Sequence, residues 1–277
     1  MEYKLPNMPY RPKDSNKGTF GKILNISGSD YMPGAAYLSS TASLKVGGGL
    51  TILSSSEKVL RTISNLAPEI VLCPTSKLSE VLNTVDIILI GCGLSLSEDA
   101  KALFFNTVNS IDKTTPLIID ADGLNILGEA AEFPERNATI LTPHPKEASR
   151  LLKCELNDVL NDVENAAKTI SQKYNCITVL KTHQTVVVSP DGKFYLNNSG
   201  CSALAKAGSG DVLAGMIAGL AAQKMNLFDA AALGVYLHGL AGEIAAKDLS
   251  EYGVLATDTL KYIPFAIKNY LTTTLSF

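Results

Sequence analysis

Short apolar runs alternate along the chain with longer segments in which apolar residues recur at helical spacing. The short runs predict strands at residues 22–27, 50–53, 69–73, 85–90, 116–120, 139–141, 177–180 and 185–188. The periodic segments predict helices at residues 34–46, 57–66, 100–111, 212–223, 227–246 and 256–270. Because the strand runs are continuously apolar, they suit strands buried on both faces. The pattern therefore predicts an α/β protein, with a mostly parallel central sheet flanked by helices on both faces.

One turn departs from this pattern. Ser189-Pro190-Asp191-Gly192 separates two short β-rich runs, at 186–188 and 194–196, and its residue types favour a tight turn. We therefore expect a short antiparallel edge at this end of the sheet. Since neither a linker-like composition nor an internal repeat divides the sequence, residues 1–277 are predicted to form a single domain.

Charge and composition exclude several classes of protein. The net charge is −3 and no basic run is present, whereas nucleic-acid binding depends on clustered Lys and Arg. Residues 1–17 are polar and lack the apolar centre of a secretory signal. Gly, His or Glu interrupts the apolar segments 213–222 and 230–246, so neither predicts a membrane span. We expect a soluble cytoplasmic protein that binds neither nucleic acid nor membrane.

The cysteines predict neither disulfides nor a zinc site. They are odd in number, widely spaced and form no CxxC pair. We interpret them as reduced thiols that serve as small apolar residues. They are Cys73, Cys92, Cys154, Cys176 and Cys201.

A glycine turn directly before a predicted helix is the strongest chemical signal. Gly208-Ser209-Gly210 precedes an apolar helical pattern that starts at Val212. Free amides and the helix dipole attract anions at such an end, and glycine lets a phosphate approach the backbone. Asp211 follows the turn at once. An ordinary N-cap is one interpretation of this aspartate, and a base that deprotonates a hydroxyl attacking a phosphoryl group is the other.

The surrounding motif favours the second interpretation. Asn197-Asn198-Ser199-Gly200, followed by Ala205-Lys206-Ala207-Gly208-Ser209-Gly210-Asp211 and an apolar helix, resembles the ribokinase-like superfamily. The resemblance implies one ribokinase-like domain in which Gly208, Ser209 and Gly210 form an anion hole for the nucleotide. It also implies that Asp211 is the catalytic base and contacts the substrate. Further motifs narrow the match to the ADP/ATP-dependent NAD(P)H-hydrate dehydratases, of the bacterial single-domain type.

Two loops in the N-terminal half of the chain contribute to that narrower match. The segment 28–36, Gly-Ser-Asp-Tyr-Met-Pro-Gly-Ala-Ala, resembles the family's Gly-Ser-x-x-Met-Pro-Gly-Ala-Ala. Taken by itself it is either a plain turn or an anion cradle; the resemblance implies that Ala36 lines the substrate site. Gly91-Cys92-Gly93 stands where the family has Gly-Pro-Gly, so Cys92 is a departure, and Gly93 is implied to contact the substrate.

Two polar motifs follow the strands predicted at 116–120 and 139–141. Asp120-Ala121-Asp122-Gly123-Leu124-Asn125 resembles the family's Asp-Ala-Asp-x-Leu-Asn. Helix capping by Asp122 is its ordinary interpretation; the resemblance implies that Asp120 and Asn125 contact the substrate or hydrated magnesium. Thr142-Pro143-His144-Pro145-Lys146-Glu147 resembles the family's Thr-Pro-His-Pro-x-Glu. His144 is then implied to bind the hydrate and Glu147 to hold Mg²⁺ through water. Sugar kinases of the superfamily have Asn where His144 stands.

The turn after residue 180 is implied to bind the nucleotide. The family's Lys-Gly-x-x-Thr matches Lys181-Thr182-His183-Gln184-Thr185, in which Thr182 replaces the glycine. Taken alone, Lys181 is either a solvated turn residue or a point charge for phosphate. The histidine of the predicted last-but-one helix, His238, is expected to be packed and satisfied in the core.

The resemblance implies an enzyme that repairs hydrated nicotinamide cofactors. ADP or ATP phosphorylates the hydroxyl of NADHX or NADPHX, and elimination of phosphate restores NADH or NADPH. It further implies Mg²⁺ as cofactor, a preference for ADP and a homotetramer. A small-molecule kinase of the same superfamily is the main alternative, and a nucleotide-binding sensor without catalysis is another. A dinucleotide-binding dehydrogenase is disfavoured because no Gly-x-Gly-x-x-Gly follows the first strand.

Overall fold

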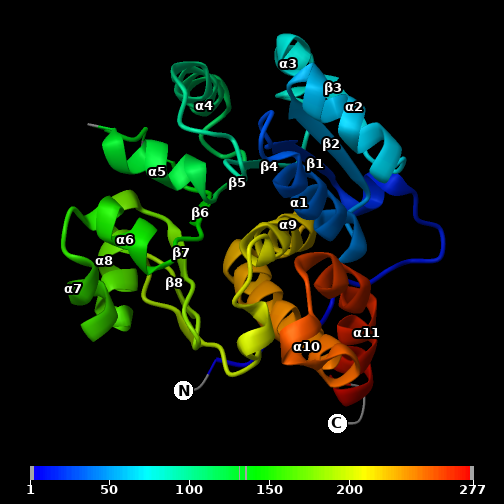
Figure 1. Ribbon diagram of the computed structural model, residues 1–277, viewed down its shortest axis with the longest axis vertical. Coiled ribbons are helices and arrows are strands. Elements are labelled where there is room, and N and C mark those ends of the chain that lie inside the picture. Colours follow the sequence, from blue (N-terminus) through cyan, green and yellow to red (C-terminus); the bar gives the residue numbers. More distant parts are fainter. Residues whose placement is uncertain (1–2, 131, 135, 275–277) are drawn as a thin grey trace.

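The central sheet has nine strands in the order β3-β2-β1-β4-β5-β6-β7-β8-β9 (Figure 1). The computed structural model describes residues 3–130, 132–134 and 136–274. Within these residues the strands are β1 (Lys22–Ile26), β2 (Leu50–Ser55), β3 (Val71–Pro74), β4 (Ile87–Ile90), β5 (Leu117–Ile119), β6 (Thr139–Leu141), β7 (Ile177–Leu180), β8 (Val186–Val188) and β9 (Phe194–Leu196).

The sheet is parallel from β3 to β7, and β7, β8 and β9 pair antiparallel. The predicted antiparallel edge is thus confirmed, and it extends to the β7–β8 pair. At the β8–β9 turn, Gly192 has a φ of 87° and its N–H bonds to the Ser189 carbonyl. Glycine adopts that backbone conformation at no steric cost, which explains how the strands reverse there.

Helices cover both faces of the sheet, as predicted. The helices are α1 (Pro33–Lys45), α2 (Glu57–Leu66), α3 (Leu78–Val81), α4 (Glu98–Ser110), α5 (Asp122–Glu129), α6 (Pro145–Leu152), α7 (Leu156–Asn161), α8 (Val163–Tyr174), α9 (Ser209–Ala222), α10 (Leu227–Gly253) and α11 (Ala256–Thr274). In the described residues, short 3₁₀ helices accompany them: η1 (Lys17–Phe20), η2 (Thr75–Lys77) and η3 (Ser202–Leu204).

The central strand β4 shows why both faces are covered. All four of its residues are fully buried, and successive side chains enter different cores. Ile87 and Leu89 pack with α1, α9, α10 and α11, whereas Ile88 and Ile90 pack with the layer that contains α4, α5, α6 and α8. Figure 1 shows these two groups of helices on opposite sides of the strands. Because helices cover both faces of β4, every position in this strand has to be apolar.

Four helices between residues 121 and 174, α5 to α8, were not assigned from the sequence. Three of them have eight residues or fewer, which is too short for a helical period to stand out. In α8 the buried residues Ala166, Ala167 and Ile170 do repeat at helical spacing, but two of them are alanines. Short helices of this kind form because tertiary packing stabilises them, more than their own propensity.

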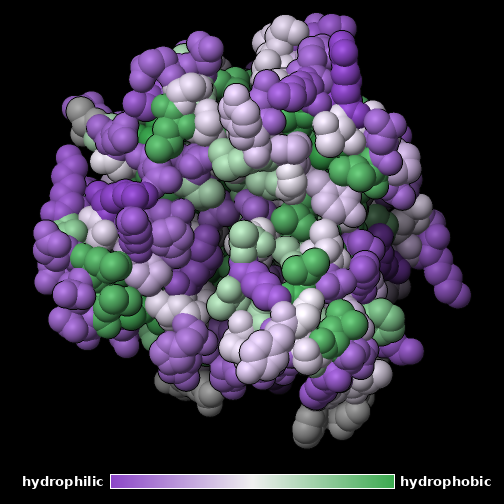
Figure 2. Space-filling view, in the orientation of Figure 1, coloured by the Kyte–Doolittle hydropathy of each residue, from purple (hydrophilic) through white to green (hydrophobic). Residues whose placement is uncertain are grey.

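The described part of the chain contains no helix long and apolar enough to cross a membrane. Figure 2 shows that hydrophilic side chains dominate the visible face and that hydrophobic ones occupy only small areas between them. The visible face therefore has the mixed surface common to folded domains in water.

Candidate active site

Four of the motifs found in the sequence begin at one edge of the sheet. Gly91 follows β4, Asp120 follows β5, Thr142 follows β6 and Lys181 follows β7. These four strands are adjacent and parallel, so their carboxyl ends lie side by side. In open α/β sheets, ligands bind beyond this edge.

Asp120 is the centre of the polar contacts there. Its side chain is 1% exposed, and its Oδ1 accepts hydrogen bonds from Lys181 Nζ and from Thr142 Oγ1, each at 2.7 Å. Its Oδ2 faces the Cys92 thiol at 3.5 Å. Burial lowers the pKa of Lys181, but the Asp120 and Glu147 carboxylates outweigh this effect and raise it. Lys181 is therefore a fixed positive charge within the group of carboxylates.

Asp211 lies in the first turn of α9. Because the N-cap of α9 is Gly208, the ordinary N-cap interpretation of Asp211 is wrong. Burial, together with the nearby Asp120 carboxylate, raises the pKa of Asp211 to about 6, against the opposing effects of Cys92 and Lys181. The carboxylate is consequently ionised at neutral pH, yet close enough to neutrality to exchange a proton readily.

The glycine turn leaves the end of α9 open. Gly208 has a φ of 88°, and a Cβ there would lie 2.5 Å from Leu38 Cδ1, so only glycine fits. The α9 N-cap makes no side-chain cap bond, and the amides of Gly210 and Asp211 have no carbonyl one turn earlier within the helix. A Cβ on Gly210 would lie 3.3 Å from Lys181 Nζ. Free amides and an ammonium group thus converge on a place suited to phosphate.

His144 and Glu147 cap each other's backbone at the start of α6. His144 Nδ1 accepts hydrogen bonds from the amides of Lys146 and Glu147, at 3.1 and 3.3 Å. Glu147 Oε2 accepts one from the His144 amide at 2.8 Å. Burial, and then Lys181, lower the pKa of His144. Burial raises the pKa of Glu147 to about 7, with Lys181 opposing and Asp120 adding to the rise.

The remaining predicted substrate residues border this edge in different ways. Gly93 has a φ of 61°, and a Cβ there would lie 2.7 Å from Ala35 Cβ, so it lies against the start of α1. Ala36 is fully buried and faces Gly28. Asn125, in α5, accepts a hydrogen bond from Arg150 Nη1 at 2.5 Å. Gly93 and Ala36 therefore border this edge through close packing of neighbouring loops.

The turn after β7 is closed by its own hydrogen bonds. Thr182 Oγ1 donates to the Gln184 carbonyl at 2.7 Å, and Thr185 Oγ1 donates to the Thr182 carbonyl at 3.2 Å. His183 and Gln184 are exposed. The structure thus brings Lys181 into the carboxylate cluster and leaves these two residues at the exposed tip of the turn.

The structure adds Cys92 and Thr142 to the site and gives His238 a neighbour there. Cys92 was interpreted as a small apolar residue, but its thiol faces two carboxylates: the Sγ atom and one oxygen each of Asp120 and Asp211 lie within 4.8 Å of one another. His238 is buried as expected, with Nε2 at 3.3 Å from Ser209 Oγ. Burial, and then Lys181, lower the pKa of His238 to about 4. A glycine on each side of Cys92, directly after a strand, was the one available signal for it.

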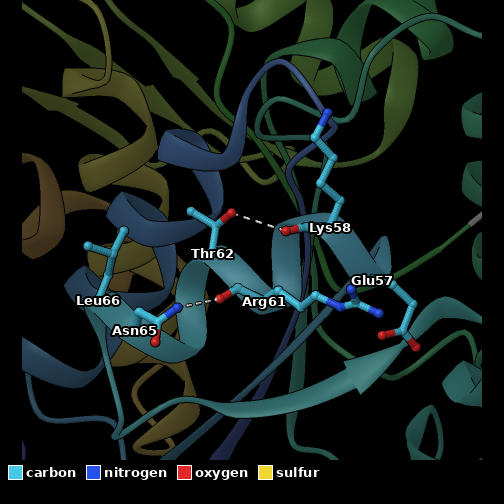
Figure 3. Close-up of a pocket in the computed structure, with 6 residues that line it drawn as sticks. All are labelled: Glu57, Lys58, Arg61, Thr62, Asn65 and Leu66. Atoms are coloured by element: carbon cyan, nitrogen blue, oxygen red, sulfur yellow. Dashed lines mark hydrogen bonds between the residues drawn. The ribbon is translucent and has the colours of Figure 1, made fainter.

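A surface hollow along α2 lies apart from these groups. Its lining comes from α2 alone, and Figure 3 shows two hydrogen bonds internal to that helix, Thr62 to Lys58 and Asn65 to Arg61. No catalytic or nucleotide-binding candidate lines it. Mixed charges on one exposed helix are typical of a solvated surface. The site is therefore assigned to the strand ends, where buried polar groups converge.

The sequence as a whole matches a known family. The family model described as NAD(P)H-hydrate dehydratase matches residues 23–265. The chain belongs to this family. A relative in Bacillus subtilis, an ADP-dependent (S)-NAD(P)H-hydrate dehydratase, is 32% identical over 274 residues, which cover 97% of each protein.

Solved structures similar to this chain have the same fold. The B. subtilis ADP/ATP-dependent NAD(P)H-hydrate dehydratase, co-crystallised with ATP and Mg²⁺, superposes with a TM-score of 0.87 at 32% identity and covers 95% of both chains. A ribokinase-like superfamily protein from Enterococcus faecalis also gives 0.87, at 29% identity, and covers 95% of this chain and 92% of its own. The predicted ribokinase-like fold is confirmed.

Other relatives are longer. The chain spans about half the length of the bifunctional NAD(P)H-hydrate repair enzymes that it matches. The one from Thermofilum pendens is 37% identical over 279 residues, which are 95% of this chain and 53% of that protein. The matched half of these longer proteins is therefore the part that corresponds to the fold described above.

Proposed function

We propose that the protein dehydrates (6S)-NADHX and (6S)-NADPHX to NADH and NADPH, with ADP or ATP as the phosphoryl donor. The observation that carries the proposal is the position of Asp211. Its carboxylate has a pKa raised to about 6 and lies beside both the open end of α9 and the Lys181 ammonium group. A base and an anion site within reach of each other are what phosphorylation of a hydroxyl requires.

The reaction proceeds in two steps. Asp211 takes the proton of the hydroxyl on carbon 6 of the hydrate, and the oxygen attacks the terminal phosphorus of the nucleotide. The bond from that phosphorus to the leaving nucleotide breaks, giving AMP from ADP or ADP from ATP. Phosphate then leaves from carbon 6 while the neighbouring ring carbon loses a proton, which restores the double bond. Phosphorylation is needed because hydroxide by itself is a poor leaving group.

The surrounding groups have complementary roles in this reaction. Lys181 and the free first-turn amides of α9, at Gly210 and Asp211, stabilise the charge that develops on the transferred phosphoryl group. The turn from Thr182 to Thr185 and Gly208 hold the rest of the nucleotide. The hydrated nicotinamide lies against Ala36, Gly93, Asp120, Asn125 and His144.

Magnesium fits the donor set of this edge. Asp120 and Glu147 offer carboxylate oxygens, and they lie close enough together that Asp120 adds to the raised pKa of Glu147. The backbone bond from His144 occupies one oxygen of Glu147, which favours contact with a hydrated ion over direct ligation. When bound, Mg²⁺ would neutralise phosphate charge.

The finer points rest on the family resemblance. ADP is the proposed preferred donor, the proposed location is the cytoplasm, and residues 1–277 are proposed to act as one domain within a homotetramer. Exposed apolar side chains near the end of α10 and on α11 offer surface for such an assembly: Leu249, Leu255 and Phe265. Size-exclusion chromatography with light scattering tests the tetramer directly.

The deciding experiment follows NADH absorbance in a mixture of the protein, Mg²⁺, NADHX and either ADP or ATP. We expect NADH to appear together with one equivalent of phosphate and of AMP or ADP. The absence of NADH with both nucleotides would contradict the dehydratase. Nucleotide consumption with a stable phosphorylated product would support a kinase of the superfamily instead. Omission of Mg²⁺ in the presence of EDTA is expected to abolish turnover.

A further inference from the structure

His238 is a buried histidine that the proposed reaction does not use. It lies in α10, which packs beside α9 (Figure 1), and its side chain contacts the start of α9. The residue is 8% exposed, and its Nε2 lies 3.3 Å from Ser209 Oγ. A histidine buried to this degree is neutral, so its ring has one N–H donor and one nitrogen acceptor. The contact with Ser209 therefore depends on which of the two faces the hydroxyl.

Ser209 differs from the two residues after it in what it can offer a phosphate. Its amide already donates to the Lys206 carbonyl at 3.2 Å. The amides of Gly210 and Asp211 have no carbonyl one turn earlier within the helix. The donor that Ser209 can still offer is therefore its hydroxyl. That hydroxyl points its proton at a phosphate when the imidazole beside it donates instead of accepting.

The position of His238 against this turn is fixed by its neighbours on α10. Gly239 packs directly against the loop that follows β9, since a Cβ on Gly239 would lie 2.1 Å from Ser199 Oγ. Ser199 Oγ also donates to the Tyr236 carbonyl at 2.8 Å. This close packing leaves α10 little room to shift. The loop after β9 and the glycine turn before α9 thus meet on one turn of α10, with the imidazole beside the second of them.

The surroundings of His238 favour a hydrogen bond in which the imidazole donates. A phosphate at the start of α9 needs donors, and a hydroxyl that accepts from the imidazole keeps its own proton for an oxyanion. The pKa of His238 agrees with this direction. Burial and then Lys181 lower it, whereas a hydrogen bond with the Ser209 backbone opposes them and raises it. A backbone group has that effect on a histidine when the ring N–H is directed at it.

We propose that His238 is a positioning residue, whose Nε2–H donates to Ser209 Oγ and turns the Ser209 hydroxyl proton toward the phosphoryl group of the bound nucleotide. This rests on one part of the proposed function, the binding of nucleotide phosphate at the start of α9. His238 acts through Ser209 and adds a side-chain donor to the free amides and Lys181. Loss of the imidazole should weaken nucleotide binding and leave the binding of the hydrate unchanged.

The test is a double-mutant cycle on His238 and Ser209. The Kd for ADP and for ATP is measured by isothermal titration, and the KM for nucleotide and for NADHX by steady-state kinetics. Ser209→Ala and His238→Phe should each raise the nucleotide Kd and KM about 3–10-fold, as expected for the loss of one hydrogen bond, and leave the KM for NADHX unchanged. The double variant should be no weaker than either single one, because both changes remove the same contact. His238→Gln keeps a side-chain N–H and should bind nucleotide more tightly than His238→Phe.

Val235→Ala is the matched control for packing. Val235 is buried on α10, three residues before His238, and lies in the core. Its truncation should lower the melting temperature and leave the nucleotide Kd unchanged. A purely structural role of His238 would give the same result, and an unchanged nucleotide Kd in either His238→Phe or Ser209→Ala would overturn the proposal. Additive losses in the double variant, or an equal rise in the KM for NADHX, would overturn it as well.

Failure of the proposed function would look different. If the wild type formed no NADH from NADHX, the dehydratase would be contradicted, but the titrations with ADP and ATP require no hydrate and would still compare the variants. A wild type that bound neither nucleotide would overturn both proposals. Should His238→Phe fail to fold, as thermal unfolding would show, Ser209→Ala and His238→Gln still decide the matter. The proposal then requires that Ser209→Ala bind nucleotide more weakly than His238→Gln does.

Discussion

Two helices begin at the same edge of the sheet and use their first-turn amides in opposite ways. At α6, the side chains of His144 and Glu147 accept hydrogen bonds from one another's backbone, which forms a complete capping box. At α9, the N-cap is Gly208 and no side chain caps the helix. The first-turn amides of α6 are therefore satisfied within the protein, whereas those of Gly210 and Asp211 in α9 are available to a ligand.

The difference shows that one helix start can stabilise the fold while a neighbouring one binds a ligand. A side-chain cap contributes about 1 kcal/mol to the folded state, and an open end forgoes this contribution. In return, an open end combines free amides with the positive end of the helix dipole, which suits phosphate. Changes at the start of α9 should accordingly reduce activity without a loss of stability, whereas changes at the start of α6 should reduce stability as well.

The largest expected effect is at the base. Asp211→Asn should lower kcat by about 10²–10⁴-fold, because the amide cannot accept the substrate proton. The nucleotide Kd should change little, since the amides and Lys181 remain. Steady-state kinetics and isothermal titration with ADP measure the two quantities. A variant with full kcat would show that Asp211 is not the base.

Gly210→Ala tests the open end without disturbing the fold. The new Cβ would lie 3.3 Å from Lys181 Nζ, in the space proposed for phosphate. We expect kcat/KM for the nucleotide to fall about 10–100-fold, a loss of about 1.4–2.7 kcal/mol of transition-state stabilisation. Alanine is the better helix former, so the free energy of unfolding should stay the same or rise. If the nucleotide kinetics stayed unchanged, the open start of α9 would not bind phosphate, and its contrast with the capped start of α6 would have no functional meaning.

Asp211 also makes the stability of the protein depend on pH. Its folded-state pKa of about 6 lies above the ordinary value of 3.8, so its ionisation opposes folding once the pH rises through this window. Asp211→Asn should therefore raise the free energy of unfolding by about 3 kcal/mol at pH 8 and by less than about 1 kcal/mol near pH 4. Urea denaturation at the two pH values checks this. A difference that is the same at both would contradict the raised pKa.

The smallest expected effect is at the capped end. His144→Ala should lower the free energy of unfolding by about 1 kcal/mol, because two amides lose their acceptor. His144→Asn keeps a capping oxygen and should retain most of that stability. Urea denaturation at pH 7 compares the two variants with the wild type. Equal stability of all three would mean that the capping box at α6 contributes nothing.

The fold was largely predictable, because the strands are mostly apolar and the long helices are periodic. Residues 87–90 show this: they are isoleucine and leucine only, and they are buried on both faces. The helices from α5 to α8 were missed, since three of them have eight residues or fewer. Such helices depend on packing against the sheet, which a local pattern does not contain.

The site was predictable in part. Asp120, Asp211 and Lys181 stood in motifs at strand ends or at a helix start, and the structure brings them together. Cys92 and Thr142 were not assigned contacts, because the thiol resembles a small apolar residue and the threonine lies in an apolar neighbourhood. Their partners are 28 and 22 residues away along the chain, so neither contact has a local signature.

The sequence by itself determined the strands and the long helices along the chain, the glycine turn before α9 and the types of side chain at each strand end. These depend on local periodicity and on the backbone conformations that glycine allows. The tertiary structure alone decided that Asp211 lies beside Asp120, Lys181 and Cys92, and that α6 is capped while α9 is open. The reason is physical: burial and nearby charge set the protonation of Asp211, and both are properties of the assembled sheet edge.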